Sequence, residues 1–139
     1  MKITIIGAGP GGYEAALYAA KKGAEVVLVE KDKLGGTCLN RGCIPTKAFL
    51  ASYDTLETVE NAKSFGINVS GEAEVDYPAI LARKNKVMES LVKGIQFLMN
   101  KNKVTVINGF GSLVDKNTVK VVKEDGTEEL VQTDYVLLA

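Results

Sequence analysis

Residues 2–30 read KITIIGAGPGGYEAALYAAKKGAEVVLVE, and this stretch decides the fold. The continuous apolar run near its end is typical of a strand buried on both faces of a parallel sheet. Its expected segments, in order, are the strand Lys2–Ile6, the glycine-rich turn Gly7–Gly12, the helix Tyr13–Lys22 and the strand Glu25–Val29. A strand, a helix and a second strand within about thirty residues predict one βαβ unit.

The turn carries glycine at the three positions of a G-x-G-x-x-G pattern. Gly7 permits the tight turn, Gly9 lets the backbone approach a pyrophosphate, and Gly12 lets helix and strand pack closely. Glu30 ends the second strand, where its carboxylate can accept hydrogen bonds from an adenosine ribose, and the pair Glu30-Lys31 disfavours a 2′-phosphate there. The pattern predicts dinucleotide binding over a merely structural turn, and by itself it does not distinguish FAD from NAD.

Composition excludes several classes of protein. The 139 residues are 46% apolar and 24% charged, and Lys+Arg and Asp+Glu are each 17, so neither nucleic acid nor an anionic membrane is an expected partner. No secretory signal is recognisable and no apolar run approaches the ~20 residues of a membrane helix, so we expect a cytoplasmic protein. With no histidine, the chain can hold no Ser-His-Asp triad and no internal Cys-His pair.

Two longer helices are predicted after the βαβ unit. One covers about Thr46–Ala62, and the other starts at Asp76 with Pro78 and continues to about Asn100. Along the second helix, apolar residues recur at helical spacing from Ile80 to Met99. Core packing is the expected role of that stripe.

Beyond residue 100 the apolar spacing changes to two, which indicates short strands. Asn108-Gly109 and Asp125-Gly126 are turn signals, and the second is a good hairpin candidate. The expected strands are Val104–Ile107, Phe110–Val114, Val119–Val122, Leu130–Gln132 and Tyr135–Leu138. The chain ends on a strand that reads as buried, so we expect residues 1–139 to be an incomplete domain whose exposed core surface self-associates.

Cys38 and Cys43 stand in the run GGTCLNRGCIPTK at residues 35–47. A zinc site would need two more ligands, and the chain has no further cysteine and no histidine, so no metal site is expected. Two unpaired buried thiols or a redox-active pair remain as alternatives. We expect Cys43 near a helix start, where the dipole favours a thiolate, with Lys47 adding positive charge one turn on. Arg41 either adds to that charge or is a solvated surface cation.

This run, with GAGPGGYEAA at residues 7–16 and Glu30, resembles the pyridine nucleotide-disulfide oxidoreductases over the whole chain. Leu39 and Ile44 are more similar to the lipoamide enzymes of that family than to its other branches. A mercuric or low-molecular-weight disulfide reductase is the alternative within the family, and a non-catalytic dinucleotide-binding module is the alternative outside it.

The resemblance implies a flavoprotein disulfide oxidoreductase. Two electrons would pass from dihydrolipoamide through a Cys38–Cys43 disulfide to FAD and then to NAD. Cys38 would be the interchange thiol and Cys43 the charge-transfer thiol beside the flavin. Lys47 would lie near the reactive edge of the flavin, Glu30 would bind the adenosine ribose, and Gly111 would meet the adenine through its backbone. The predicted cofactor-binding residues are Gly7, Gly9, Gly12, Glu30, Lys31, Gly36, Thr37, Lys47 and Gly111.

The resemblance also implies an α/β, Rossmann-like, three-layer FAD-binding domain over residues 1–139. Helices would flank a parallel sheet, and a small antiparallel β-meander from about Phe110 to Gln132 would cover one side. Members of the family add NAD-binding and dimerisation domains, and the second of these supplies a His-Glu pair to the partner subunit. The longer protein is thus expected to be a homodimer that acts on lipoamide carried by an acyl-carrier protein domain, whereas residues 1–139 alone are expected to be inactive.

Overall fold

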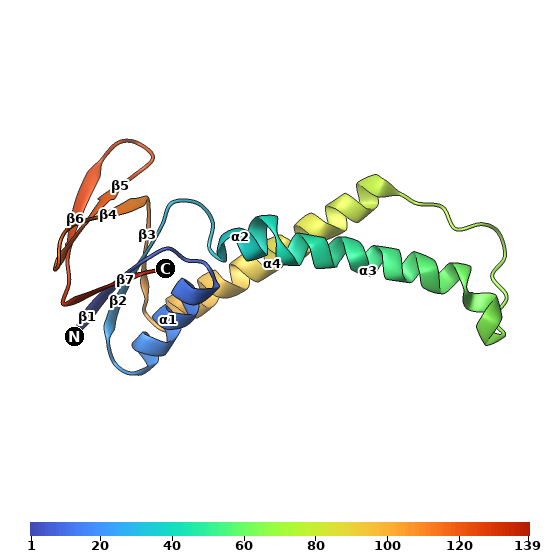
Figure 1. Cartoon of the computed structure of the whole chain (residues 1–139), viewed down its shortest axis with the longest axis horizontal. Coiled ribbons are helices and arrows are strands. Elements are labelled where there is room, and N and C mark those ends of the chain that lie inside the picture. Colours follow the sequence, from blue (N-terminus) through green and yellow to red (C-terminus); the bar gives the residue numbers. More distant parts are fainter.

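The computed structural model describes all of residues 1–139. Its larger sheet has four strands in the order β3-β2-β1-β7, and every neighbouring pair is parallel. These strands are β1 (Lys2–Ile6), β2 (Glu25–Glu30), β3 (Thr105–Asn108) and β7 (Tyr135–Leu138). Because β1 lies between β2 and β7, the first and last strands of the chain are neighbours in the sheet (Figure 1).

One face of this sheet is covered by α1 (Pro10–Lys21) and by the C-terminal part of α4 (Tyr77–Lys101). The core on this side joins the strands to both helices, and Ile5, Leu28 and Met99 are its largest fully buried side chains. Burial of each such side chain contributes roughly 1.5–3 kcal/mol. The apolar strands and the apolar faces of the two helices therefore meet in one packed layer.

The other face is covered by a three-stranded antiparallel meander in the order β4-β5-β6. Its strands are β4 (Phe110–Asp115), β5 (Thr118–Val122) and β6 (Glu128–Gln132). Val27 and Val29 of the parallel sheet pack here against buried valines of the meander, among them Val119 and Val121. The expected arrangement of helices, parallel sheet and meander in three layers is confirmed.

Two more helices precede α4: α2 (Gly36–Arg41) and α3 (Cys43–Glu60), followed by the short 3₁₀ helix η1 (Ala62–Phe65). Figure 1 shows α3 and the N-terminal part of α4 lying side by side and extending away from the sheets. We call this helix pair, with the segment that joins it, the arm (residues 43–91). Asp76 begins α4 as expected, because its Oδ1 accepts a hydrogen bond from the Ala79 N–H at 2.9 Å.

The core role expected for the apolar stripe of α4 is only partly correct, because the N-terminal part of that helix lies in the arm. Ile95 and Met99 are buried, whereas Leu81 and Leu91 are exposed in the arm. With 25 residues and a rise of about 1.5 Å per residue, α4 is roughly 37 Å long. It is therefore longer than the sheet it covers, and only its C-terminal part reaches the core.

The boundaries near the cysteines also differ from expectation. The helix expected from about Thr46 begins at Cys43 as α3, and a short helix that was not expected, α2, precedes it. Gly35, at φ +97°, turns the chain into α2, and Gly42 separates the two helices. None of the helices combines the length and the apolar character that a membrane crossing requires.

Candidate functional site

The glycine turn connects β1 to α1 and is tied to the neighbouring strand. Gly7 adopts φ +102°, and its N–H donates to the Val29 carbonyl at 2.8 Å. A Cβ on Gly12 would lie 1.8 Å from the Gly7 carbonyl oxygen, so no other residue can occupy this crossing of helix and turn. A Cβ on Gly9 would meet nothing within 4 Å. The backbone at Gly9 is therefore the open face of the turn, where a phosphate can approach.

Glu30 holds this turn from the end of β2. Its Oε2 accepts a hydrogen bond from the Ala8 N–H at 2.7 Å, and its Oε1 accepts one from the Asp32 N–H at 2.9 Å. The Glu30 carbonyl accepts a further bond from the Gly109 N–H at 2.8 Å. The carboxylate thus lies at the junction of the glycine turn with the ends of β2 and β3.

A cavity of about 210 Å³ opens beside Glu30. Its lining residues are Ile6, Gly7, Val29, Glu30, Lys31, Gly109, Phe110 and Gly111. Four predicted cofactor-binding residues, from three separate parts of the sequence, therefore meet around one cavity. A Cβ on Gly111 would come within 3.1 Å of Ile6 and Val29, and the Lys31 ammonium lies 5.9 Å from the centre of the Phe110 ring. A slot with apolar walls and an acidic residue at its rim suits an adenosine moiety.

The cysteine segment is bound directly to the glycine turn. The Gly35 N–H donates to the Ala8 carbonyl at 2.8 Å, and a Cβ on Gly36 would lie 2.7 Å from the Gly9 Cα. Thr37 follows on the exposed surface of α2. Gly9, which is expected to approach the pyrophosphate, and Gly36, another predicted cofactor-binding residue, are therefore in close backbone contact. This arrangement suits an extended dinucleotide that passes from the cavity toward the cysteines.

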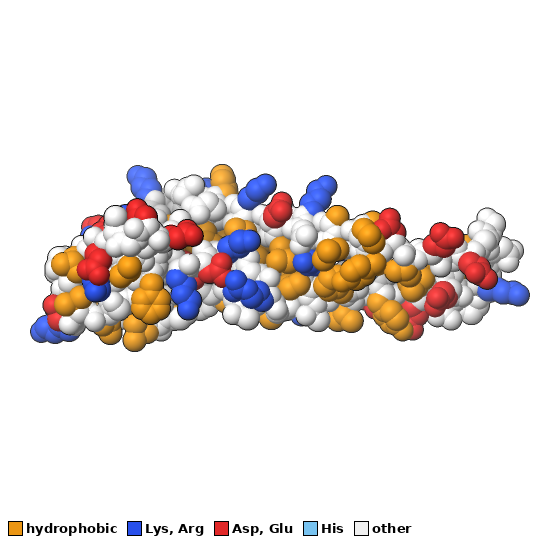
Figure 2. All heavy atoms as spheres, turned by 90° about the horizontal axis from the view of Figure 1, so that it is seen from above, with side chains coloured by type: hydrophobic (Ala, Val, Ile, Leu, Met, Phe, Trp, Pro, Cys, Tyr) orange, Lys and Arg blue, Asp and Glu red, His pale blue; other side chains and the backbone are white.

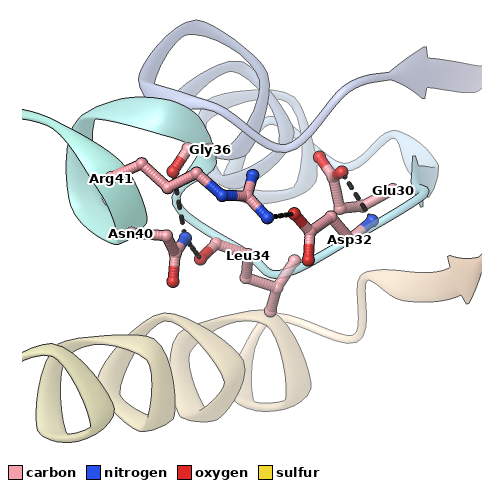
Figure 3. Close-up of polar contacts among 6 residues, drawn as sticks. All are labelled: Glu30, Asp32, Leu34, Gly36, Asn40 and Arg41. Atoms are coloured by element: carbon pink, nitrogen blue, oxygen red, sulfur yellow. Dashed lines mark hydrogen bonds and ion pairs between the residues drawn. The ribbon is translucent and has the colours of Figure 1, made fainter. Parts of the chain in front are cut away.

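Asn40 fixes the shape of the segment that carries Cys38. Its Nδ2 donates to the Leu34 carbonyl at 3.1 Å and to the Gly36 carbonyl at 3.0 Å, as Figure 3 shows. The amide therefore ties the loop before α2 to the helix. Sequence reasoning missed this residue, although an Asn between two cysteines in a glycine-rich run is a residue type that satisfies backbone groups.

Cys38 lies on α2 and Cys43 is the first residue of α3, so the expectation that Cys43 lies near a helix start is confirmed. Both are free thiols, Cys38 half-buried and Cys43 exposed. The hydrogen bond between the two thiol groups is the main cause that raises the pKa of Cys38, and desolvation raises it further. The positive charge of Lys47 acts in the opposite direction. The structure thus brings the two cysteines and Lys47 into one site.

Two further side chains define the surroundings of the thiols. Tyr13, in the first turns of α1, has a raised pKa, chiefly because of burial and then because of negative charge at Glu14 and Cys38. Arg41 pairs instead with Asp32, Nη2 to Oδ2 at 2.5 Å, on the exposed side of α2 (Figure 3). Tyr13 therefore lies near the thiols. Of the two roles considered for Arg41, a charge beside the thiols or a solvated surface cation, the structure supports the second.

The fold and the site together define a Rossmann-like α/β domain that holds a pair of neighbouring thiols on the helices that follow its βαβ unit. The family model described as pyridine nucleotide-disulphide oxidoreductase matches residues 1–139. The chain belongs to the pyridine nucleotide-disulphide oxidoreductase family.

Individual relatives agree with this assignment. The dihydrolipoyl dehydrogenase of Bacillus subtilis is 44% identical over 140 residues, covering 100% of this chain and 30% of the relative. That of Acholeplasma laidlawii is 50% identical over 107 residues, covering 77% of this chain and 32% of the relative. The crystal structure of LpdA from Mycobacterium tuberculosis superposes with a TM-score of 0.89 at 29% identity, over 99% of this chain and 31% of that one. The chain thus spans about 30% of the length of these relatives.

Proposed function

We propose that residues 1–139 form the FAD-binding and dithiol part of an enzyme that oxidises dihydrolipoamide, with NAD as the final electron acceptor. The observation that carries the proposal is the pair of free thiols, Cys38 on α2 and Cys43 at the start of α3, which lie close enough for Cys43 to raise the pKa of Cys38. Helix α2 starts in close backbone contact with the glycine turn. The names of the relatives support lipoamide as the substrate. Bound FAD would supply the acceptor for the electrons of the dithiol.

The residues proposed to hold FAD follow the path from the cavity to the thiols. Glu30, Lys31 and Gly111 would hold the adenosine, the ribose hydroxyls donating to the Glu30 carboxylate. The backbone at Gly9 and Gly36 would approach the pyrophosphate. Gly7 and Gly12 shape the turn, and Thr37 and Lys47 would lie toward the flavin ring.

The thiol chemistry is an exchange of disulfide bonds. A thiolate of dihydrolipoamide would attack Cys38 Sγ in the oxidised pair, so that a mixed disulfide forms and Cys43 leaves as a thiolate. The second substrate thiolate would then attack the substrate sulfur of that mixed disulfide, and Cys38 would leave as a thiolate. The substrate loses two electrons and two protons, and the cysteine pair gains the two electrons. The chain has no histidine, so an imidazole that accepts these protons would come from elsewhere.

Exposure alone does not show which thiol exchanges with substrate and which contacts the flavin, because Cys43 is the more exposed of the pair. A spectroscopic experiment assigns these two roles. Residues 1–139 are mixed with FAD, reduced by two electrons, and examined for a long-wavelength charge-transfer band. We expect the band in the original chain and in Cys38→Ser, and its loss in Cys43→Ser. A band that survives in Cys43→Ser contradicts the assignment, and a chain that binds no FAD contradicts cofactor binding by these residues.

The substrate is tested on the cysteine pair itself. The oxidised chain is exposed to dihydrolipoamide or to glutathione under matched thiol concentration and pH, and formation of free Cys38 and Cys43 is followed by mass spectrometry. We expect faster reduction by dihydrolipoamide. Equal or faster reduction by glutathione contradicts the lipoamide assignment and favours a reductase of small disulfides. The homodimer, the carrier-domain partner and the cytoplasmic location stay predictions for a longer protein.

A further inference from the structure

The loop that joins β2 to α2 borders the cavity proposed for the adenosine. Glu30, the last residue of β2, and Lys31, the first residue of the loop, both line that cavity. Residues 31–35 belong to neither a helix nor a strand, and we call them the site loop. The position of Lys31 and the orientation of the Glu30 carboxylate therefore depend on side-chain contacts within and across this loop.

Side chains from the end of α2 fold back onto the site loop at two points (Figure 3). Asn40 holds the later part of the loop, because its Nδ2 donates to the carbonyls of Leu34 and Gly36. Arg41 holds the earlier part, because its Nη2 donates to Asp32 Oδ2 at 2.5 Å. The loop is therefore closed near both of its ends by neighbouring residues of one helix.

Asp32 connects the ion pair to the cavity. Its backbone N–H donates to Glu30 Oε1 at 2.9 Å, and Glu30 Oε2 accepts a bond from the Ala8 N–H at 2.7 Å. Three successive polar contacts thus lead from the guanidinium of Arg41 to the glycine turn. The carboxylate in the middle of this chain is the one proposed to accept hydrogen bonds from the ribose.

The ion pair is exposed, so its strength depends on salt. The side chains of Arg41 and Asp32 are 67% and 37% exposed. Figure 2 shows basic and acidic side chains interspersed on the visible face of the sheet-containing end, so no patch of one sign dominates the charge there. When the pair opens, Asn40 still holds the loop at Leu34. The motion is then confined to the start of the loop, and Cys38 on α2 stays in place.

We propose that Asp32 and Arg41 form a clamp that holds the start of the site loop in the conformation needed for FAD and slows release of the cofactor. This inference rests on the proposed function. Neither residue of the clamp is among those proposed to hold FAD, so both are positioning residues that act through Glu30 and Lys31. A loop that is already ordered loses less conformational entropy when its ligand binds. Opening of the clamp removes this advantage, and the loss falls mainly on the rate of dissociation.

Amide hydrogen exchange of the chain without FAD tests the clamp itself. In Arg41→Gln we expect the Asp32 amide to exchange about 3-fold faster, the size of effect that an exposed ion pair produces. The charge swap Asp32→Arg with Arg41→Asp should restore the protection, after allowance for the intrinsic rate of the new residue. Lys120→Gln removes one partner of a comparably exposed ion pair on the meander and should leave this amide unchanged.

Two results of the exchange experiment overturn the proposal. One is an Asp32 amide that exchanges equally fast in the original chain and in Arg41→Gln. The other is a charge swap that protects this amide no better than Arg41→Gln does, because the ion pair would then not be the cause.

Release of FAD tests the consequence, and the fluorescence of the freed cofactor gives the rate. We expect release about 3-fold faster from Arg41→Gln than from the original chain, and the original rate from Lys120→Gln. At about 1 M salt, where screening acts within ~3 Å, the original chain and Arg41→Gln should release FAD at the same rate. Equal rates at low salt, or a difference that persists at high salt, overturn the proposal. A chain that binds no FAD contradicts the proposed function, and the exchange rate of the Asp32 amide still decides whether the clamp exists.

Discussion

The carboxylate of Glu30 accepts a hydrogen bond from the Ala8 N–H at 2.7 Å, across 22 positions in the sequence. This bond joins the end of β2 to the glycine turn, and a second bond from the Asp32 N–H occupies the other carboxylate oxygen. The residue proposed to bind a ribose thus also organises the turn proposed to bind the pyrophosphate. Changes at Glu30 should therefore affect stability as well as ligand binding.

Glu30→Ala leaves two backbone N–H groups without their acceptor, and the free energy of unfolding should fall by about 1–3 kcal/mol. Urea denaturation followed by circular dichroism measures this change. Glu25→Ala is the control, because Glu25 lies on the same strand and forms only a solvent-exposed ion pair with Lys2. Such pairs contribute ~0–1 kcal/mol. A loss no larger at Glu30 than at Glu25 would show that the carboxylate does not organise the turn.

Gly12→Ala should be the most damaging glycine substitution, because its Cβ would collide with the Gly7 carbonyl at 1.8 Å. Helix α1 would have to move away from the turn, and we expect a loss of at least ~3 kcal/mol or a failure to fold. Gly11→Ala, one residue earlier in the same helix, meets nothing within 4 Å. It should be neutral or stabilise by up to ~1 kcal/mol through helix propensity. Thermal unfolding of the two variants side by side decides the matter.

The alkylation of Cys38 should depend on Cys43. The shared hydrogen bond raises the pKa of Cys38, so its reactive thiolate forms only at higher pH than for an ordinary thiol. In Cys43→Ala this bond is lost, and the midpoint of the rate against pH should move to lower pH. Iodoacetamide labelling followed by tryptic mass spectrometry reads Cys38 alone, since cleavage at Arg41 separates it from Cys43. An unchanged or higher midpoint would refute the coupling.

Lys47 should act on the same midpoint with the opposite sign. Its positive charge lowers the pKa of Cys38, so Lys47→Gln should move the alkylation midpoint to higher pH. Arg41→Gln removes an equal charge whose guanidinium is engaged by Asp32, and the midpoint should stay where it is. Equal shifts in the two variants would mean that the effect comes from net charge and not from the position of Lys47.

Local spacing made much of this site predictable from the sequence. Gly7, Gly9 and Gly12 lie within one turn and one helix start, so their pattern alone indicates their geometry. That Cys43 lies near a helix start followed in the same way from its neighbours. The contacts of Asn40 and Tyr13 could not be predicted from local spacing, because they depend on how α2 packs against α1 and the turn. The roles proposed for the cysteines and the cofactor residues stay predictions.

The apolar stripe of α4 shows the limit of periodicity. Helical spacing correctly indicated that Leu81, Leu91 and Ile95 belong to one helix. It could not tell which part of that helix would meet the sheet, because this depends on the length of the sheet and on the partner helix. The same apolar stripe is therefore buried in the core at Ile95 and exposed on the surface of the arm at Leu81.

The position of β1 between β2 and β7 also sets an order of assembly. Lys2 donates its backbone N–H to Asp134 at 2.7 Å, a contact between residues 132 positions apart. Contacts of such separation slow folding, because a long loop must close before they form. During synthesis on the ribosome, β1 can pair with β2 early while α1 packs against them. The two helices of the arm, α3 and α4, can pack together soon afterwards. Strand β1 gains its second neighbour only after β7 has emerged, so the nascent sheet lacks this pairing until synthesis has passed residue 138.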